Sequence, residues 1–215
     1  SARYRRMSKN LQTTRREAVI MPTVGLTGDV GAGKSTLCKE WAAMGAHIID
    51  ADSVARALWD DPGIRREAEK RWGAGFFDAP HKELWAKIAA KIFADEEEYR
   101  FASRLIHKKT METIKKMAAG ADGWAVAEIP LLYEGGHEGW LDCVVYAAAP
   151  FEKRVERNAK RRWNAEEVSR RENRLLPSEE KMARADFVLV NDGTEEEWRQ
   201  KARGLWLKLV EGGVK

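Results

Sequence analysis

Residues 25–36 have the sequence GLTGDVGAGKST, which contains the complete phosphate-loop pattern of Gly28, four residues, Gly33, Lys34 and Ser35. Glycines allow successive backbone N–H groups to turn inward and form an anion-binding nest, and a helix N-terminus adds the positive end of its dipole. A lysine at this position reaches the β- and γ-phosphates of a nucleoside triphosphate, and the serine hydroxyl is a ligand for Mg²⁺. The pattern therefore predicts binding of a nucleoside triphosphate together with magnesium.

The segments on either side of this loop match that function. Residues 23–26 predict a short buried strand, and residues 37–41 predict the beginning of a helix. A GTPase would be expected to carry an Asn-Lys-x-Asp guanine signature, which this sequence lacks, so ATP is the expected nucleotide. The residues expected to bind it are Gly28, Val30, Gly31, Ala32, Gly33, Lys34, Ser35 and Thr36.

A pair of carboxylates follows the next expected strand, residues 47–49. Asp50 and Asp52 would lie at the carboxyl end of that strand, where ligands bind in open parallel sheets. Asp52 is a candidate general base that orients an acceptor hydroxyl, a candidate carboxylate that holds Mg²⁺ with Ser35, or a helix N-cap. Asp50 is expected to support it at the acceptor side. Arg56, four residues further on, either binds an acceptor phosphate or pairs with Asp52.

Apolar runs of strand length recur between helical stretches, which is typical of an α/β fold with a parallel sheet. Residues 62–119, by contrast, predict helices alone and therefore an all-helical insertion. We expect a three-layer α/β phosphate-loop kinase fold with a mostly parallel sheet, a helical insertion and a helical lid. The further expected strands are residues 124–129, 141–148 and 187–190, and the expected helices of the insertion are residues 64–72, 82–93 and 96–117.

The C-terminal third of the chain carries two signals for the start of a helix. Residues 151–176 are basic and helical, and Asn164 with Glu167 forms a capping box that divides them into two helices. Thr194 with Glu197 predicts the start of a final helix that has one apolar face. Late basic helices of this kind are typical of small-molecule kinases, in which they close over the nucleotide and exclude water.

Length and composition limit the class of protein. The 215 residues are enough for one α/β domain with a small insertion, and 44% hydrophobic and 33% charged residues indicate a globular chain. The net charge of +4 comes from residues 1–20, which hold six basic residues and one acidic residue. A folded basic face is not indicated, so we expect a disordered basic extension rather than a nucleic-acid-binding arm, with residues 21–215 forming the kinase domain.

The cysteines and the apolar runs indicate the environment. Cys38 and Cys143 lack metal-ligand spacing and have the surroundings of buried core residues, which fits a reducing cytoplasm. No apolar run approaches the roughly 18 residues that a membrane-spanning helix needs. We therefore expect a cytoplasmic protein with neither a membrane nor a nucleic-acid partner, and the pattern indicates no particular oligomeric state.

In their order along the chain, these segments resemble the dephospho-CoA kinase family. The resemblance extends from residue 23 to about residue 205. The succession of DAD, PLLYE and the C-terminal motif is far more specific than the phosphate loop alone. The motifs are GLTGDVGAGKST (25–36), IIDADSVAR (48–56), IAAKIFAD (88–95), LIH (105–107), IPLLYE (129–134) and LPSEEKMARADFVLVNDGT (176–194).

The resemblance implies transfer of the γ-phosphoryl group of ATP to the 3′-hydroxyl of dephospho-CoA, the last step of coenzyme A biosynthesis. It also implies an acceptor subdomain at residues 60–120 and a lid at residues 150–177. The implied site residues are the acceptor contacts His107 and Leu131, the catalytic lid arginines Arg157 and Arg161, and Asn191 at the adenine edge. Core packing for His107, a solvated helix face for the arginines and a plain turn for Asn191 are the alternative interpretations.

The sequence departs from the family pattern at Pro80-His81, at Lys108 and at Leu175. These departures concern the acceptor contacts and the lid rather than the reaction. A nucleoside or nucleotide kinase is a second interpretation of the same fold, and the DAD and PLLYE motifs argue against it. A third is a non-catalytic ATP-binding switch that uses the basic extension on nucleic acid, which would bind in a salt-dependent way.

Overall fold

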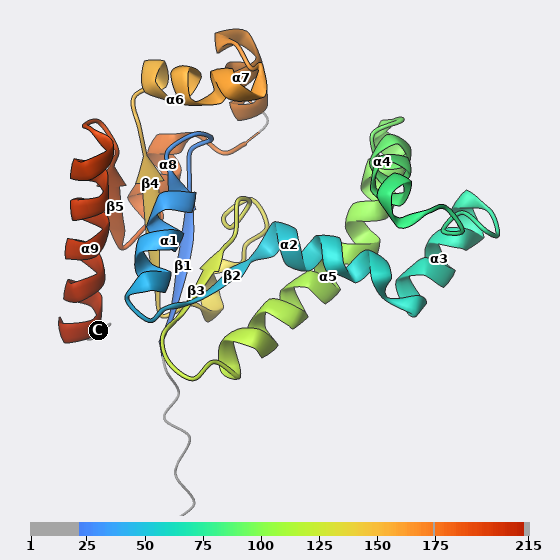
Figure 1. Ribbon diagram of the computed structural model, residues 1–215, viewed down its shortest axis with the longest axis horizontal. Helices are drawn as coiled ribbons and strands as arrows, with labels where there is room; N and C mark the ends of the chain where they lie inside the picture. Colours follow the sequence, from blue (N-terminus) through green and yellow to red (C-terminus); the bar gives the residue numbers. More distant parts are fainter. Residues whose placement is uncertain (1–21, 174, 213–215) are drawn as a thin grey trace, which may run out of the picture.

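The computed structural model describes residues 22–173 and 175–212, so the expected disordered extension at residues 1–20 lies outside the described part. Five parallel strands form one sheet in the order β2-β3-β1-β4-β5 (Figure 1). All the strands predicted from apolar runs are present within a few residues. They are β1 (Thr23–Gly28), β2 (His47–Asp50), β3 (Ala125–Glu128), β4 (Cys143–Ala148) and β5 (Phe187–Val190).

Helices cover both faces of this sheet, which confirms the expected three-layer α/β fold. On one face, α1 (Lys34–Ala43) and α9 (Glu195–Gly212) pack together, and the rings of Trp41 and Trp206 stack with their centroids 5.4 Å apart. On the other face lie α5 (Glu96–Ala119) and α8 (Ser178–Arg184). The α8 helix was not predicted, because seven residues span too few turns for an apolar period to appear.

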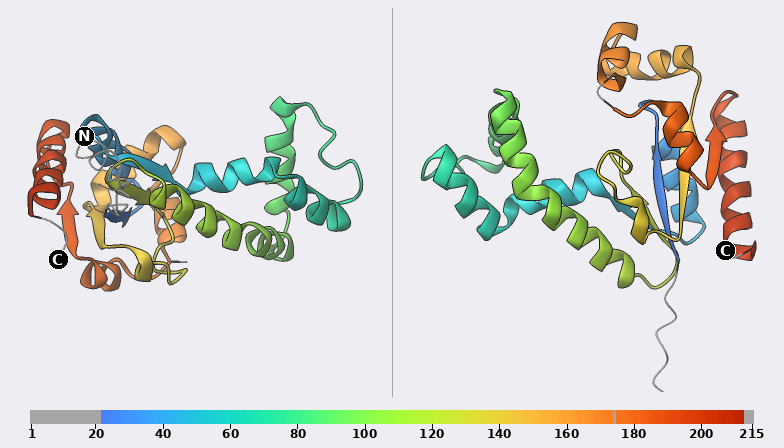
Figure 2. Two further views of the ribbon diagram at one scale, coloured as in Figure 1. Left: turned by 90° about the horizontal axis from the view of Figure 1, so that it is seen from below. Right: turned by 180° about the vertical axis from the view of Figure 1, so that it is seen from behind.

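The all-helical insertion extends away from the sheet, as both views of Figure 2 show. We call it the helical arm, residues 60–120. The arm and the preceding Trp59 share an aromatic core, in which Trp59 and Trp72 stack 5.3 Å apart. Buried Glu98 accepts a hydrogen bond from Nε1 of Trp72 at 2.7 Å. The arm contains α3 (Pro62–Trp72), α4 (His81–Ile92) and α5, whose C-terminal part packs on the sheet. The α2 helix (Ala51–Ala57) with the 3₁₀ helix η1 (Leu58–Asp60) leads into the arm from the sheet.

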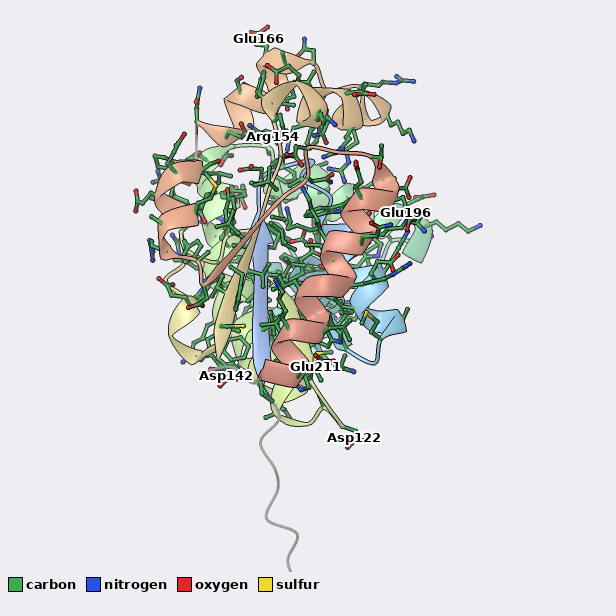
Figure 3. The ribbon with its side chains drawn as sticks, turned by 90° about the vertical axis from the view of Figure 1, so that its left-hand side faces the viewer. Asp122, Asp142, Arg154, Glu166, Glu196 and Glu211 are labelled. Atoms are coloured by element: carbon green, nitrogen blue, oxygen red, sulfur yellow. The ribbon has the colours of Figure 1, made fainter. Side chains whose placement is uncertain are left out.

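Residues 150–177 form a second helical segment above the sheet. It contains α6 (Phe151–Asn158), the 3₁₀ helix η3 (Ala159–Arg161) and α7 (Ala165–Glu172), so the prediction of two helices is confirmed. Arg154 and Glu172 form an ion pair between α6 and α7, and Figure 3 labels Arg154 where this segment meets the sheet. The capping signals are also confirmed, because Asn164 Oδ1 accepts a bond from Glu167 N at 2.9 Å.

Because all five strands are parallel, their carboxyl ends lie along one edge of the sheet. Strand pairing places Glu128 beside Leu26 of β1 and beside Asp50 of β2. The phosphate loop leaves β1 at the same edge. None of the helices in the described ranges is long and apolar enough to cross a membrane.

Candidate active site

The phosphate loop has a backbone that only glycine permits at two key positions. Gly28 has φ 143° and Gly33 has φ 96°, both in the region that L-side chains avoid. A Cβ atom on Gly28 would also overlap the carbonyl oxygen of Ala147 in β4. The glycine spacing in the sequence is therefore required both by the turn and by close packing of the loop on the sheet.

Lys34 begins α1 and returns its ammonium group to the mouth of the loop. Its Nζ donates to the carbonyl oxygens of Gly28 at 3.1 Å and Asp29 at 3.0 Å. Burial lowers the pKa of Lys34, while the negative charges of Glu128 and Asp29 oppose that shift. The ammonium is thus positioned at the loop, and its contact with the β- and γ-phosphates stays a prediction.

Side chains distant in sequence hold the loop from behind. Asn191 Nδ2 donates to Ala32 O at 2.8 Å, and Trp198 Nε1 donates to Gly33 O at 3.1 Å. The Asn191 side chain is buried, and its Oδ1 accepts a bond from Arg157 at 2.9 Å. The side-chain amide of Asn191 is thus engaged with the loop and with Arg157, and its expected place at the adenine edge stays a prediction.

Asp29 is a loop residue whose role the sequence analysis missed. Its buried carboxylate accepts hydrogen bonds from Tyr146 Oη and from Ser178 Oγ, both at 2.6 Å. Tyr146 belongs to β4 and Ser178 begins α8, so the bonds join the loop to two elements that lie far away in sequence. No local signal could have revealed them.

Asp50, which ends β2, and Asp52, in α2, have separate roles. Asp50 is the N-cap of α2, because its Oδ1 accepts from Asp52 N at 3.0 Å and its Oδ2 from Ser53 Oγ at 2.6 Å. Among the described residues, no hydrogen-bond donor contacts the Asp52 carboxylate. Desolvation of this carboxyl and repulsion from Asp50 raise the pKa of Asp52, against the attraction of Arg56 and Lys34. The capping interpretation of Asp52 is therefore wrong, and its carboxylate remains available for chemistry.

Glu128 is a third carboxylate at this edge, and the sequence analysis did not single it out. It ends β3, and its Oε2 accepts a bond from Cys38 Sγ at 3.4 Å. Burial raises the pKa of Glu128, and the charges of Asp50 and Asp52 add to that shift while Lys34 opposes it. A carboxylate that ends a buried strand next to the phosphate loop was the signal that could have revealed it.

The donor chemistry at this edge suits magnesium. A hydroxyl from Ser35 and carboxylates from Asp52 and Glu128 are hard oxygen ligands, and a cation beside them would relieve the repulsion that raises the pKa values of both carboxyls. Within residues 22–173 and 175–212, no group of three or more His, Cys, Asp or Glu side chains could hold a metal ion alone. The residues therefore fit an ion that is bound together with nucleotide phosphates rather than in a protein cage.

The residues expected to contact the acceptor lie on the arm side of this edge. The Arg56 guanidinium lies 5.9 Å from the centre of the Trp85 ring of α4, so its cation is directed toward the helical arm. Leu131, after β3, leaves 44% of its surface exposed although the neighbouring Leu132 is fully buried. His107 of α5 is exposed and contacts His137. Pairing of Arg56 with Asp52 is not observed.

The two candidate arginines of residues 150–177 differ in position. Arg157 NH1 donates to Gly31 O at 3.3 Å, so this side chain reaches the phosphate loop. Arg161 is exposed, and its guanidinium lies 5.4 Å from the Trp163 ring, so the structure does not bring it to the loop. A cavity of about 430 Å³ lies beside the loop, with Asp29 and Lys181 among its lining residues.

Comparison with known proteins gives one consistent result. A family model described as dephospho-CoA kinase matches residues 22–197. A dephospho-CoA kinase of Corynebacterium diphtheriae is 36% identical over 88% of this chain and 98% of its own length. A dephospho-CoA kinase of Chlorobaculum tepidum is 34% identical over 87% of this chain and 94% of its own length.

Solved structures show the same fold. A crystal structure from Thermus thermophilus has a TM-score of 0.71 at 28% identity and covers 91% of this chain and 98% of that one. A shikimate kinase from Acinetobacter baumannii has a TM-score of 0.53 at 16% identity, with 91% and 96% of the two chains covered. At that identity the second likeness concerns the α/β architecture alone.

Proposed function

Since this chain belongs to the dephospho-CoA kinase family, we propose that it transfers the γ-phosphoryl group of ATP to the 3′-hydroxyl of dephospho-CoA and thereby forms CoA and ADP. The observation that carries the proposal is the arrangement at one sheet edge. The Lys34 ammonium lies at the mouth of the phosphate loop, and the Asp52 carboxylate, freed from capping by Asp50, belongs to the same edge. A phosphate-binding cation and an unbonded base are the two groups that phosphoryl transfer to a hydroxyl requires.

Asp52 acts as the general base in this reaction. The acceptor oxygen forms a bond to the γ-phosphorus while its proton passes to the Asp52 carboxylate, and the bond from the γ-phosphorus to the bridging oxygen of ADP breaks. The raised pKa of Asp52 makes its carboxylate a stronger base than an ordinary aspartate. Lys34 stabilises the negative charge on the bridging and γ-oxygens.

Magnesium would be held by Ser35 and Glu128 together with the nucleotide, with Asp52 as the alternative carboxylate. When bound, it neutralises phosphate charge and helps to orient the γ-phosphoryl group. The position of Glu128 between the loop and Asp50 supports a sharing of tasks, in which Glu128 serves the ion and Asp52 serves the acceptor hydroxyl.

The remaining proposed roles follow from position. The helical arm, residues 60–120, receives the acceptor, with Arg56, His107 and Leu131 as contacts. Residues 150–177 form the lid, whose Arg157 already reaches the phosphate loop and whose Arg161 moves toward the phosphates on closure. The described cysteines are both buried and free, which supports a reducing compartment such as the cytoplasm.

A coupled assay of ADP release tests the proposal. With Mg²⁺ and ATP, dephospho-CoA should stimulate ADP release and yield a product heavier by one phosphoryl group on its ribose. Adenosine, the other common nucleosides and a nucleoside monophosphate serve as competing acceptors. Rapid turnover of one of these without turnover of dephospho-CoA would favour a nucleoside or nucleotide kinase instead.

A further inference from the structure

Two histidines from distant parts of the chain contact each other beside the sheet. Nε2 of His107, in α5, lies 2.7 Å from Nε2 of His137, which directly precedes the 3₁₀ helix η2 (Glu138–Trp140). The ring centroids are 4.7 Å apart. At this distance one imidazole donates a hydrogen bond and the other accepts it, so at least one of the two nitrogens must lack a proton. The bond connects the helical arm to the segment between β3 and β4.

The segment that carries His137 is firmly attached to the sheet. Leu132 is fully buried, and its carbonyl oxygen accepts a bond from His137 N at 2.9 Å. Glu134 lies between them in sequence and forms an ion pair of 3.2 Å with buried Lys181 of α8. The exposed Leu131, a proposed acceptor contact, begins the same segment. The segment that carries His137 is therefore rigid, and His137 is close in sequence to Leu131, a proposed acceptor contact.

Gly135 provides the space that the His137 ring occupies. A Cβ atom on Gly135 would overlap the imidazole at Nε2 and Cδ2. The φ angle of Gly135 is outside the positive range, so an alanine there would not strain the backbone. Gly136, with φ 64°, makes the turn. The absence of a side chain at residue 135 thus has a packing reason, which is the position of His137 against His107.

We propose that His137 is a positioning residue for the acceptor site, whose hydrogen bond orients His107 and holds α5 against the β3–β4 segment. This inference rests on the proposed function, because His107 is a proposed contact of dephospho-CoA. The phosphate loop takes no part in the bond, so its loss should weaken binding of the acceptor and leave binding of ATP unchanged.

The surroundings of the pair make the bond sensitive to pH. His137 faces Lys115 of α5 and Glu138 of η2, and Arg184 of α8 forms an ion pair with Glu138. Burial lowers the pKa of His137, and the positive charges of His107 and Lys115 lower it further against the attraction of Glu138. The neutral imidazole is therefore favoured in the folded protein. The bond needs one unprotonated Nε2, which His137 provides at neutral pH. It is lost when His137 also gains a proton, at a pH below the ordinary histidine range because the pKa of His137 is lowered.

Two variants break the bond in different ways. His137→Ala removes the imidazole, and Gly135→Ala keeps both rings but displaces one of them. We expect each to raise the KM for dephospho-CoA about three- to tenfold, the range of one hydrogen bond, with the KM for ATP and kcat within about twofold. Adding His137→Ala to His107→Ala should cause no further loss. Gly139→Ala is the matched control, because a Cβ atom there meets nothing within 4 Å and the backbone is not strained.

The pH dependence separates positioning from a merely structural role. In the wild type, the KM for dephospho-CoA should stay constant near neutral pH and rise as the pH falls below the ordinary histidine range, more steeply than the KM for ATP. His137→Gln keeps an amide that can donate to His107 but cannot titrate, so it should restore a low KM and flatten part of this rise. Imidazole ¹⁵N shifts of the protein without substrate should show a shared hydrogen bond that Gly135→Ala abolishes.

The inference is overturned if His137→Ala and Gly135→Ala leave the KM for dephospho-CoA and its pH profile unchanged, or if they raise the KM for ATP equally. The proposed function fails by a different result, the absence of dephospho-CoA turnover by the wild type. In that case the ¹⁵N measurement still decides whether the histidine pair exists.

Discussion

The phosphate loop with the residues that support it differs from the acceptor side of the site, around Asp52 and Leu131. The difference is how fully the polar groups are hydrogen-bonded within the protein. On the loop side, Asn191 and Trp198 each donate to a loop carbonyl oxygen, and Lys34 donates to two. On the acceptor side, the Asp52 carboxylate accepts no hydrogen bond from the described residues, and Leu131 is 44% exposed. The hydrogen bonds that support the loop are thus formed without a ligand, whereas the acceptor side presents a carboxylate that no described donor contacts.

This difference follows from what each side has to do. A phosphate loop binds by means of backbone N–H groups, whose direction depends on a rigid backbone, so bonds from behind the loop preorganise it. The acceptor side must leave its base unbonded, because a carboxylate already engaged by donors is a weaker base. We therefore expect substitution of the base to affect the rate, and substitutions behind the loop to affect stability and ATP binding.

The largest effect is expected for Asp52→Asn. The amide keeps the size of the side chain but cannot take the acceptor proton, so kcat should fall about 10²- to 10⁴-fold. The Kd for ATP and the melting temperature should change little, because Asp50 and not Asp52 caps α2. Steady-state kinetics at two Mg²⁺ concentrations check the assignment. Recovery of most of the rate at high Mg²⁺ would indicate that Asp52 binds Mg²⁺ rather than accepting the proton of the acceptor hydroxyl.

Lys34→Ala is the corresponding change on the loop side. It removes the cation that stabilises charge on the transferred group, so kcat should fall about 10²- to 10³-fold. The Kd for ATP should rise less than this, because the backbone nest remains. Titration of ATP by calorimetry together with the coupled assay separates the two effects. An unchanged kcat would show that the ammonium does not act on the phosphates.

Asn191→Ala should act mainly on stability. It leaves the buried Ala32 carbonyl oxygen without a donor and Arg157 without its side-chain acceptor, which costs about 1–3 kcal/mol. For a domain of this size that is a fall in melting temperature of about 2–10 °C. The KM for ATP should rise with it. Asn173→Ala, at an exposed position, is the control, and equal melting temperatures for the two variants would contradict the support role.

The smallest effect is expected for Asp50→Asn, which sharpens the assignment of the base. Asparagine caps a helix as well as aspartate, so stability should be kept. Loss of the Asp50 charge removes a repulsion that raises the pKa of Asp52, so the acid limb of kcat should move to lower pH. Rate profiles between pH 4.5 and 8 measure the shift. A limb that stays in place would mean that another group titrates.

Much of the fold could be predicted because its signals are local. The strand before the loop, the helix after it, the helices of the arm and the cap at Asn164 each depend on residues within about one helical turn or one strand of each other. The α8 helix escaped prediction because it is short. Its stability comes from distant contacts, such as Lys181 with Glu134.

The site was predicted less evenly, for the same reason. The position of the Lys34 ammonium at the loop is set within one turn of helix, so a local pattern could indicate it. The bond from Asn191 to the loop was not predicted, because its acceptor is a carbonyl oxygen 159 residues away. Arg161 and Trp163 are two residues apart in sequence, yet only the structure shows that the arginine stacks on the tryptophan.

By itself, the sequence determined that this protein binds a nucleoside triphosphate, because glycine spacing dictates the backbone of the phosphate loop without reference to the rest of the chain. It also determined the parallel sheet and the helical arm through their apolar periodicity. Only the tertiary structure decided that Glu128 joins the carboxylates, that Asp29 ties the loop to β4 and α8, and that His137 meets His107. Those contacts depend on strand order and on how the helices pack. No local sequence pattern specifies which side chains far apart in the chain will come into contact.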